Sequence, residues 1–169
     1  MNYLALSGFL NGILIFLLGI FVYFRNRKEK INQFFCLFTS VITFWQINYG
    51  FWQLADNEIE SLFFLKLLMI GGVMVAPSIF GLTLSILDLL ENKRKSLIII
   101  FLLTGGISIL IFSPFFISGT KNYSFYPYWP IAGIGANLVM IWSMFITILS
   151  CIFLIKGYLS KKEEKKNQI

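Results

Sequence analysis

The chain has 169 residues, of which 57% are hydrophobic and only 13% are charged, and its formal net charge is +6. Ordinary soluble domains contain roughly 45–50% apolar and about 25% charged residues, so this composition argues against a soluble domain and predicts surfaces that face lipid. The basic residues form short clusters at the ends of apolar runs, a pattern typical of membrane anchoring and not of nucleic-acid binding.

Five apolar segments are long enough to cross a bilayer, because a core about 30 Å thick needs roughly 20 helical residues. Backbone groups at that depth cannot bond to water, so each continuous run is predicted to be a helix. We therefore predict an all-α, polytopic membrane protein with a single domain over residues 1–169. Its helices are expected at 4–24, 33–54, 62–89, 97–117 and 131–155, followed by a basic tail at 156–169.

The distribution of Lys and Arg predicts the orientation of this bundle. Connector 25–30 holds four of them, connector 90–96 holds three and the tail holds five, whereas connectors 55–61 and 118–130 together hold one, Lys121. By the positive-inside rule the N-terminus is expected outside and the C-terminus in the cytoplasm. The predicted location is the cell membrane, crossed several times.

The second predicted helix carries an unusual band of aromatic and amide side chains. Trp45, Tyr49 and Trp52 are spaced i, i+4, i+7 and share a face, with Gln46 and Gln53 on an adjoining stripe. One hypothesis is a ligand pocket wall that opens toward the outer face. The alternative is an aromatic belt at the membrane interface together with hydrogen bonds between helices.

Lys66 is the one ionisable residue placed inside an expected membrane segment near its outer end. An isolated charge at depth costs roughly 2.5–3.5 kcal/mol on insertion scales, so this ammonium needs a partner. Glu58 and Glu60 are near in sequence, and the side chain could instead extend to the interface. The functional hypothesis is that Lys66 binds an anionic ligand.

Gly71, Gly72 and Pro77 interrupt the third predicted helix near mid-membrane. Pro77 removes one backbone hydrogen bond and is expected to bend the helix, which could serve as a hinge. The alternative is close helix packing, because Gly72 and Ala76 have small-xxx-small spacing.

The longest connector, 118–130, is rich in aromatic residues and contains two prolines as stiffeners. Tyr126, Tyr128 and Trp129 are its candidate ligand-binding residues. This outer loop is expected either to cap a pocket or to lie at the level of the lipid headgroups.

Several kinds of chemistry have no matching residues in this chain. It contains no histidine, and Cys36 and Cys151 lie within apolar segments without a second ligand cluster. No nucleotide-binding, zinc-protease or nucleophile-elbow motif is present. We therefore predict no catalytic residues, no metal site, no cofactor and no enzymatic activity.

The order of short motifs resembles a known family. In sequence order these are the Arg-Asn-Arg-Lys cluster at 25–28, Asn-Gln-Phe-Phe at 32–35, Phe-Trp-Gln at 44–46, Phe-Phe-Leu-Lys at 63–66, Ala76-Pro77 and Tyr126-Pro127. Together they resemble the N-terminal seven-helix membrane region of bacterial sensor histidine kinases. The resemblance implies a sensor of two-component signalling; the family region has two further helices and then cytoplasmic domains that hold the kinase chemistry.

The leading hypothesis is a membrane sensor or receptor module that passes a signal through its fifth helix to the cytoplasm. Its expected partners are the lipid bilayer, a small and mostly apolar ligand, a cytoplasmic signalling domain or partner reached through the tail, and a second copy in a homodimer. Nucleic acid is not expected. The alternative is a small membrane transport or assembly protein without a signalling partner.

Overall fold

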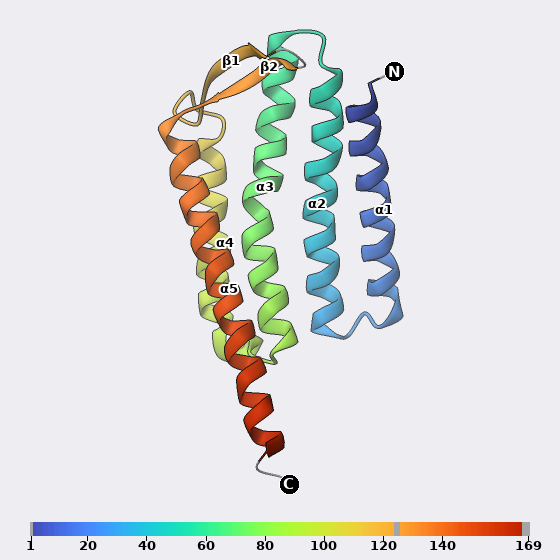
Figure 1. Ribbon diagram of the computed structural model, residues 1–169, viewed down its shortest axis with the longest axis vertical. Coiled ribbons are helices and arrows are strands. Elements are labelled where there is room, and N and C mark those ends of the chain that lie inside the picture. The colour runs from blue at the N-terminus through green and yellow to red at the C-terminus, as the bar shows by residue number, and fades with distance from the viewer. Residues whose placement is uncertain (1, 124–125, 167–169) are drawn as a thin grey trace.

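The computed structural model describes residues 2–123 and 126–166, and the side chains of residues 127 and 161–166 lie outside that description. Five helices run along one axis, and a two-stranded hairpin covers one end of them (Figure 1). In chain order the elements are α1 (Tyr3–Arg25), α2 (Lys30–Leu54), α3 (Glu58–Ile86), α4 (Leu90–Leu110), β1 (Ile117–Tyr123), β2 (Tyr126–Ala132) and α5 (Ile134–Lys166). The predicted basic tail is helical as far as Lys166, and residues 167–169 lie outside the described residues.

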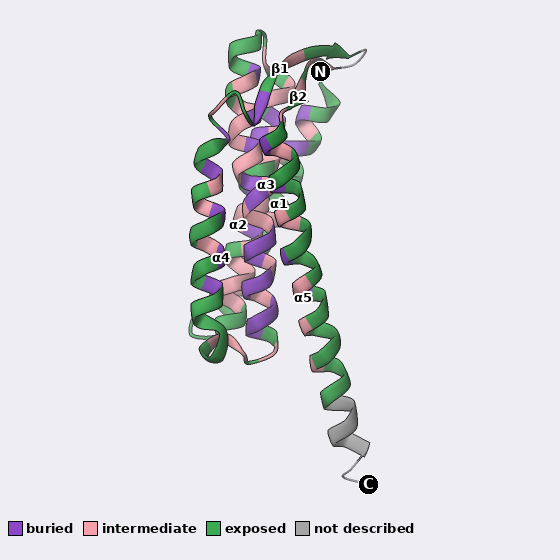
Figure 2. Cartoon of the chain, turned by 90° about the vertical axis from the view of Figure 1, so that its left-hand side faces the viewer, coloured by how far each residue is buried: buried purple, intermediate pink, exposed green. Residues whose placement is uncertain are grey.

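The central helix of the bundle is α3. It packs against α2 on one side and against α4 and α5 on the other, whereas α1 packs along α2. Buried residues concentrate on α3, while the outward faces of α1, α4 and α5 are exposed (Figure 2). Those outward faces are rich in leucine, isoleucine and phenylalanine, which suits a lipid environment and not water.

Small residues allow α1 and α2 to approach closely. Gly8, Gly12 and Gly19 face α2, and a Cβ on Gly8 would lie 2.9 Å from the carbonyl oxygen of Gln46. The Thr43 hydroxyl donates a hydrogen bond of 3.2 Å to the Gly12 carbonyl across the interface. This combination of glycines and hydroxyl groups is what holds helices together in lipid.

A second set of contacts joins α3 to α4 and α5. Phe80 and Leu84 of α3 are buried together with Ile146 of α5 in one apolar cluster. The Trp142 indole of α5 donates a hydrogen bond of 3.1 Å to the hydroxyl of Thr104, which is buried on α4. The helices α4 and α5 are therefore joined to each other by a hydrogen bond and to α3 by apolar packing.

The fourth helix ends earlier than predicted. It was expected over 97–117, but α4 ends at Leu110 and residues 111–116 form turns. Pro114 explains the difference, because it lacks a backbone N–H and disfavours helical geometry at the residue before it. The predicted end at residue 117 was wrong.

The connector predicted at 118–130 forms a β-hairpin, so the all-α fold class was wrong for this segment. β1 and β2 pair antiparallel, with Ile117 opposite Ala132 and Thr120 opposite Pro130. Both strands are edge strands, which is where proline is tolerated in a sheet. The aromatic residues of β2 favour an extended backbone. The prolines predicted as loop stiffeners therefore lie within a strand.

Four helices are long and apolar enough to cross a membrane: α1, α2, α3 and residues 134–160 of α5. The first turns of α4 contain Glu91, Lys93, Arg94 and Lys95, which shorten its apolar part. Length and composition therefore support four of the five predicted spans.

Replacing Gly19 with alanine is expected to separate α1 from α2, because the added Cβ would overlap the Thr39 hydroxyl oxygen. Overpacking of this kind costs about 1–3 kcal/mol, so the unfolding temperature of the purified chain should fall. The double variant Gly19→Ala with Thr39→Ala should recover part of the loss.

The matched control is Gly106→Ala on α4, where nothing lies within 4 Å of the added Cβ. A Gly19→Ala variant that unfolds at the same temperature as Gly106→Ala would contradict the close packing of α1 on α2.

Candidate functional site

The hairpin rests on the ends of α2 and α3 through three hydrogen bonds. The Trp52 indole donates to the Tyr128 carbonyl at 3.3 Å, and the Tyr128 hydroxyl donates to the Asp56 carbonyl at 3.2 Å. The Thr120 hydroxyl donates to the Glu58 carboxylate at 2.7 Å. Both strands are therefore tied to α2, to α3 or to the connector between them.

Four aromatic rings form a cluster beneath these bonds, which we call the aromatic cap: Tyr49, Trp52, Tyr126 and Trp129. Trp52 stacks on Tyr126 with ring centroids 5.9 Å apart and 9° between the planes. Trp129 and Tyr49 each lie 5.8 Å from Trp52. Such pairs contribute roughly 0.5–1.5 kcal/mol each beyond their burial. Each of the other three rings packs against Trp52.

The remaining predicted residues of α2 lie on its other faces. A Cβ on Gly71 would lie 3.0 Å from the Cα of Trp45, so Trp45 sits where α2 meets α3. Gln46 lies against two glycines of α1. The structure therefore brings Tyr49 and Trp52 to the hairpin and places Trp45 and Gln46 at the interfaces with α3 and α1.

Lys66 reaches the end of α4. Its ammonium donates to the Phe112 carbonyl at 3.5 Å, just beyond the last residue of that helix. The expected partners have other bonds: Glu58 accepts from Thr120, and Glu60 accepts from a backbone N–H of the α2–α3 connector at 3.3 Å. A cation at this position is stabilised by the carbonyl end of the helix dipole.

The predicted hinge residues Gly71, Gly72 and Pro77 lie within a continuous helix. α3 is helical from Glu58 to Ile86, and Pro77 is fully buried within it. The Ser78 hydroxyl bonds two carbonyls of the preceding turn, at 2.7 and 2.9 Å. Gly71 allows α2 to approach α3 closely. A hinge in α3 stays a prediction.

The connection from the hairpin to α5 is a feature that the sequence analysis missed. Only Gly133 separates β2 from α5; its N–H donates to the Phe116 carbonyl at 2.9 Å, and the Gly135 N–H donates to the Phe115 carbonyl at 3.0 Å. A Cβ on Gly133 would overlap the Phe115 carbonyl oxygen. We call Phe115, Phe116, Gly133 and Gly135 the junction. The Gly-Ile-Gly spacing that follows the aromatic segment is the signal that could have indicated it.

An apolar cavity of about 200 Å³ lies beside the junction. Its walls are Ile107 and Leu110 of α4, Leu138 and Val139 of α5, and three of the junction residues. A cavity near this size can hold a small apolar group of the size of benzene.

Two polar atoms near the hairpin, Gln53 Nε2 and Ser61 Oγ, are buried without a hydrogen-bond partner among the described residues. Each can donate to a further polar group, as buried polar atoms generally do. Within residues 2–123 and 126–166, no group of three or more His, Cys, Asp or Glu is placed to hold a metal ion. The arrangement offers stacking, apolar contact and hydrogen bonding.

A family model described as the N-terminal 7TM region of histidine kinase matches residues 8–169. This range includes the hairpin and most of α1, and it confirms the resemblance seen in the motifs. No curated protein and no solved structure matches the chain.

Replacing Trp52 with alanine is expected to loosen the hairpin, because it removes the bond to Tyr128 and the contacts with three rings. Aromatic pairs contribute roughly 0.5–1.5 kcal/mol and a hydrogen bond about 1 kcal/mol, so amide exchange in residues 117–132 should accelerate about tenfold or more. Hydrogen–deuterium exchange of the purified chain measures this. Trp45→Ala is the control, and equal protection of the hairpin in both variants would contradict the role of Trp52.

Proposed function

The chain belongs to the family of N-terminal 7TM regions of histidine kinases, and we propose that it carries a signal from the hairpin end of the bundle to a cytoplasmic kinase region. The family is defined by a membrane region that precedes the kinase, so kinase chemistry is assigned to the partner and not to these residues. The observation that carries the proposal is the junction, which joins the hairpin to the start of α5.

In the proposed orientation the hairpin is outside and the tail is in the cytoplasm. The hairpin end carries Asp56, Glu58, Glu60 and a single connector base, Lys121. The opposite end carries the basic connector 25–30 and the basic start of α4, and the tail continues from there. This distribution of Lys and Arg supports the orientation.

The route of the signal in this proposal is α5. It starts at the junction and extends beyond the other helices at the opposite end (Figure 1). Near that end Gly157 lies so close to Leu87, at the end of α3, that an added Cβ would overlap the leucine side chain. A shift of α5 at the junction therefore changes how its far half meets α3, because packed helices move between discrete arrangements.

The proposed stimulus is a small, mostly apolar ligand that meets the aromatic cap and the cavity beside the junction. Such a ligand would contact Phe115 and Gly135 in the cavity and, in this proposal, the rings of the cap. The ligand can shift α5 only if its affinity differs between the arrangements of α5 before and after the shift.

Gly133→Ala is expected to move the start of α5, because a backbone carbonyl of Phe115 cannot rotate away from the added Cβ. The distance between spin labels at Glu91 and Tyr158, both exposed near the tail end, should shift by about 1–2 Å or become more broadly distributed. Double electron–electron resonance of the chain in nanodiscs measures this distance.

Gly106→Ala provides the control, since its Cβ meets open space. If a folded Gly133→Ala variant has the same label distances as wild type and Gly106→Ala, the junction does not transmit motion and the proposal fails.

A further inference from the structure

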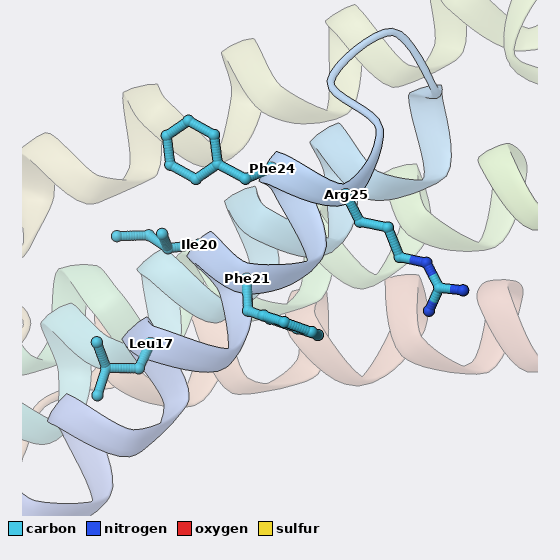
Figure 3. Close-up of a pocket in the computed structure, with 5 residues that line it drawn as sticks. All are labelled: Leu17, Ile20, Phe21, Phe24 and Arg25. Carbon is cyan, nitrogen blue, oxygen red and sulfur yellow. The ribbon is translucent and has the colours of Figure 1, made fainter.

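The outward face of α1 carries a groove that takes no part in the proposed signalling. It is an open hollow of about 810 Å³ along one helical stripe, lined by Leu17, Ile20, Phe21, Phe24 and Arg25 (Figure 3). These positions follow the i, i+3, i+4, i+7 spacing of a single face. The glycines of α1 face α2, so this face of the helix opens toward the surroundings of the bundle.

One end of the groove carries the Arg25 guanidinium, and the Arg27 guanidinium lies over a ring that lines the groove. Arg25 forms that end, and its side chain extends from the last turn of α1 beside Phe21 (Figure 3). The guanidinium carbon of Arg27 lies over the Phe24 ring, 5.4 Å from its centroid, which holds a second cation against that ring. Residues 25–30 contain four bases and one acid, Glu29, so the end of the groove is strongly positive.

An open apolar groove with Arg25 at its end and Arg27 over one of its rings matches a molecule with an apolar chain and an anionic head. The 23 residues of α1 span about 35 Å, so Arg25 falls near headgroup level when the apolar part of the helix fills the hydrocarbon core. Guanidinium groups bind phosphate oxygens in pairs of hydrogen bonds. A zwitterionic lipid would bring an additional cation close to both guanidinium groups, which disfavours it.

We propose that this groove is a binding site for one anionic phospholipid, with an acyl chain along Leu17 and Phe21 and the phosphate on Arg25 and Arg27. The site does not depend on the proposed signalling function, and either can fail without the other.

Native mass spectrometry of the purified full chain, titrated with phosphatidylglycerol or phosphatidylcholine, tests the proposal. The first phosphatidylglycerol should bind at least tenfold more tightly than phosphatidylcholine. The double variant Arg25→Gln, Arg27→Gln should weaken that binding by about tenfold or more. The control, Arg94→Gln with Lys95→Gln, removes the same charge from the start of α4 and should leave the first binding step unchanged.

Phe21→Ala keeps both cations and removes an apolar wall, so it should weaken phosphatidylglycerol binding severalfold, whereas Phe145→Ala on α5 should not. This pair also keeps the proposal testable if the arginine variant fails to fold. Both side chains are exposed in the structure, at 69% and 56%.

Four results would overturn the proposal. Equal losses in the two double variants would indicate diffuse surface charge, and equal affinity for both lipids would remove the role of the phosphate group. Displacement of the lipid by glycerol phosphate would indicate a site for free phosphate. A dimer that excludes phosphatidylglycerol would indicate that a second copy covers the groove.

Discussion

Helices in a bilayer gain little from burying apolar side chains against one another, because lipid tails are as apolar as leucine. This bundle therefore depends on close approach through small residues: Gly19 against Thr39, Gly71 against Trp45 and Gly81 against Phe34. A Cβ added at any of these positions would force the neighbouring atoms to shift, so the glycines limit how the helices can be rotated against one another. That constraint sets which residues of α2 face the hairpin and which face α1 or α3.

The two ends of the bundle are held together differently. At the hairpin end, ring stacking around Trp52 and hydrogen bonds from Thr120 and Tyr128 add directional contacts to an apolar cluster. At the other end, the far part of α5 meets α3 mainly through apolar packing, such as Gly157 against Leu87. Directional contacts are either made or broken, and packed apolar surfaces move between discrete arrangements. A helix that joins the two ends can convert the breaking of specific contacts into a movement.

Apolar run length was sufficient to predict the five helices, because membrane thickness sets the length that a span needs. The spacing of Tyr49 and Trp52 also placed both on one face. The sequence could not predict which residues pack against each helix face. That depends on how the helices are rotated and on where α4 ends. Lys66 found its partner at the Phe112 carbonyl only because Pro114 stops α4 early. The hairpin was missed because β2 contains two prolines and neither strand has a regular alternation of polar and apolar residues.

The proposed signal path requires the hairpin and the basic ends of the helices to lie on opposite sides of a membrane. Single cysteines at Lys121 and at Arg94, in a chain with Cys36 and Cys151 replaced by alanine, can be labelled in intact cells with an impermeant maleimide. We expect Lys121→Cys to be labelled from outside and Arg94→Cys to be labelled only after the membrane is permeabilised. Labelling of both from the same side, or the reverse pattern, would contradict the proposed arrangement and the signal path along α5.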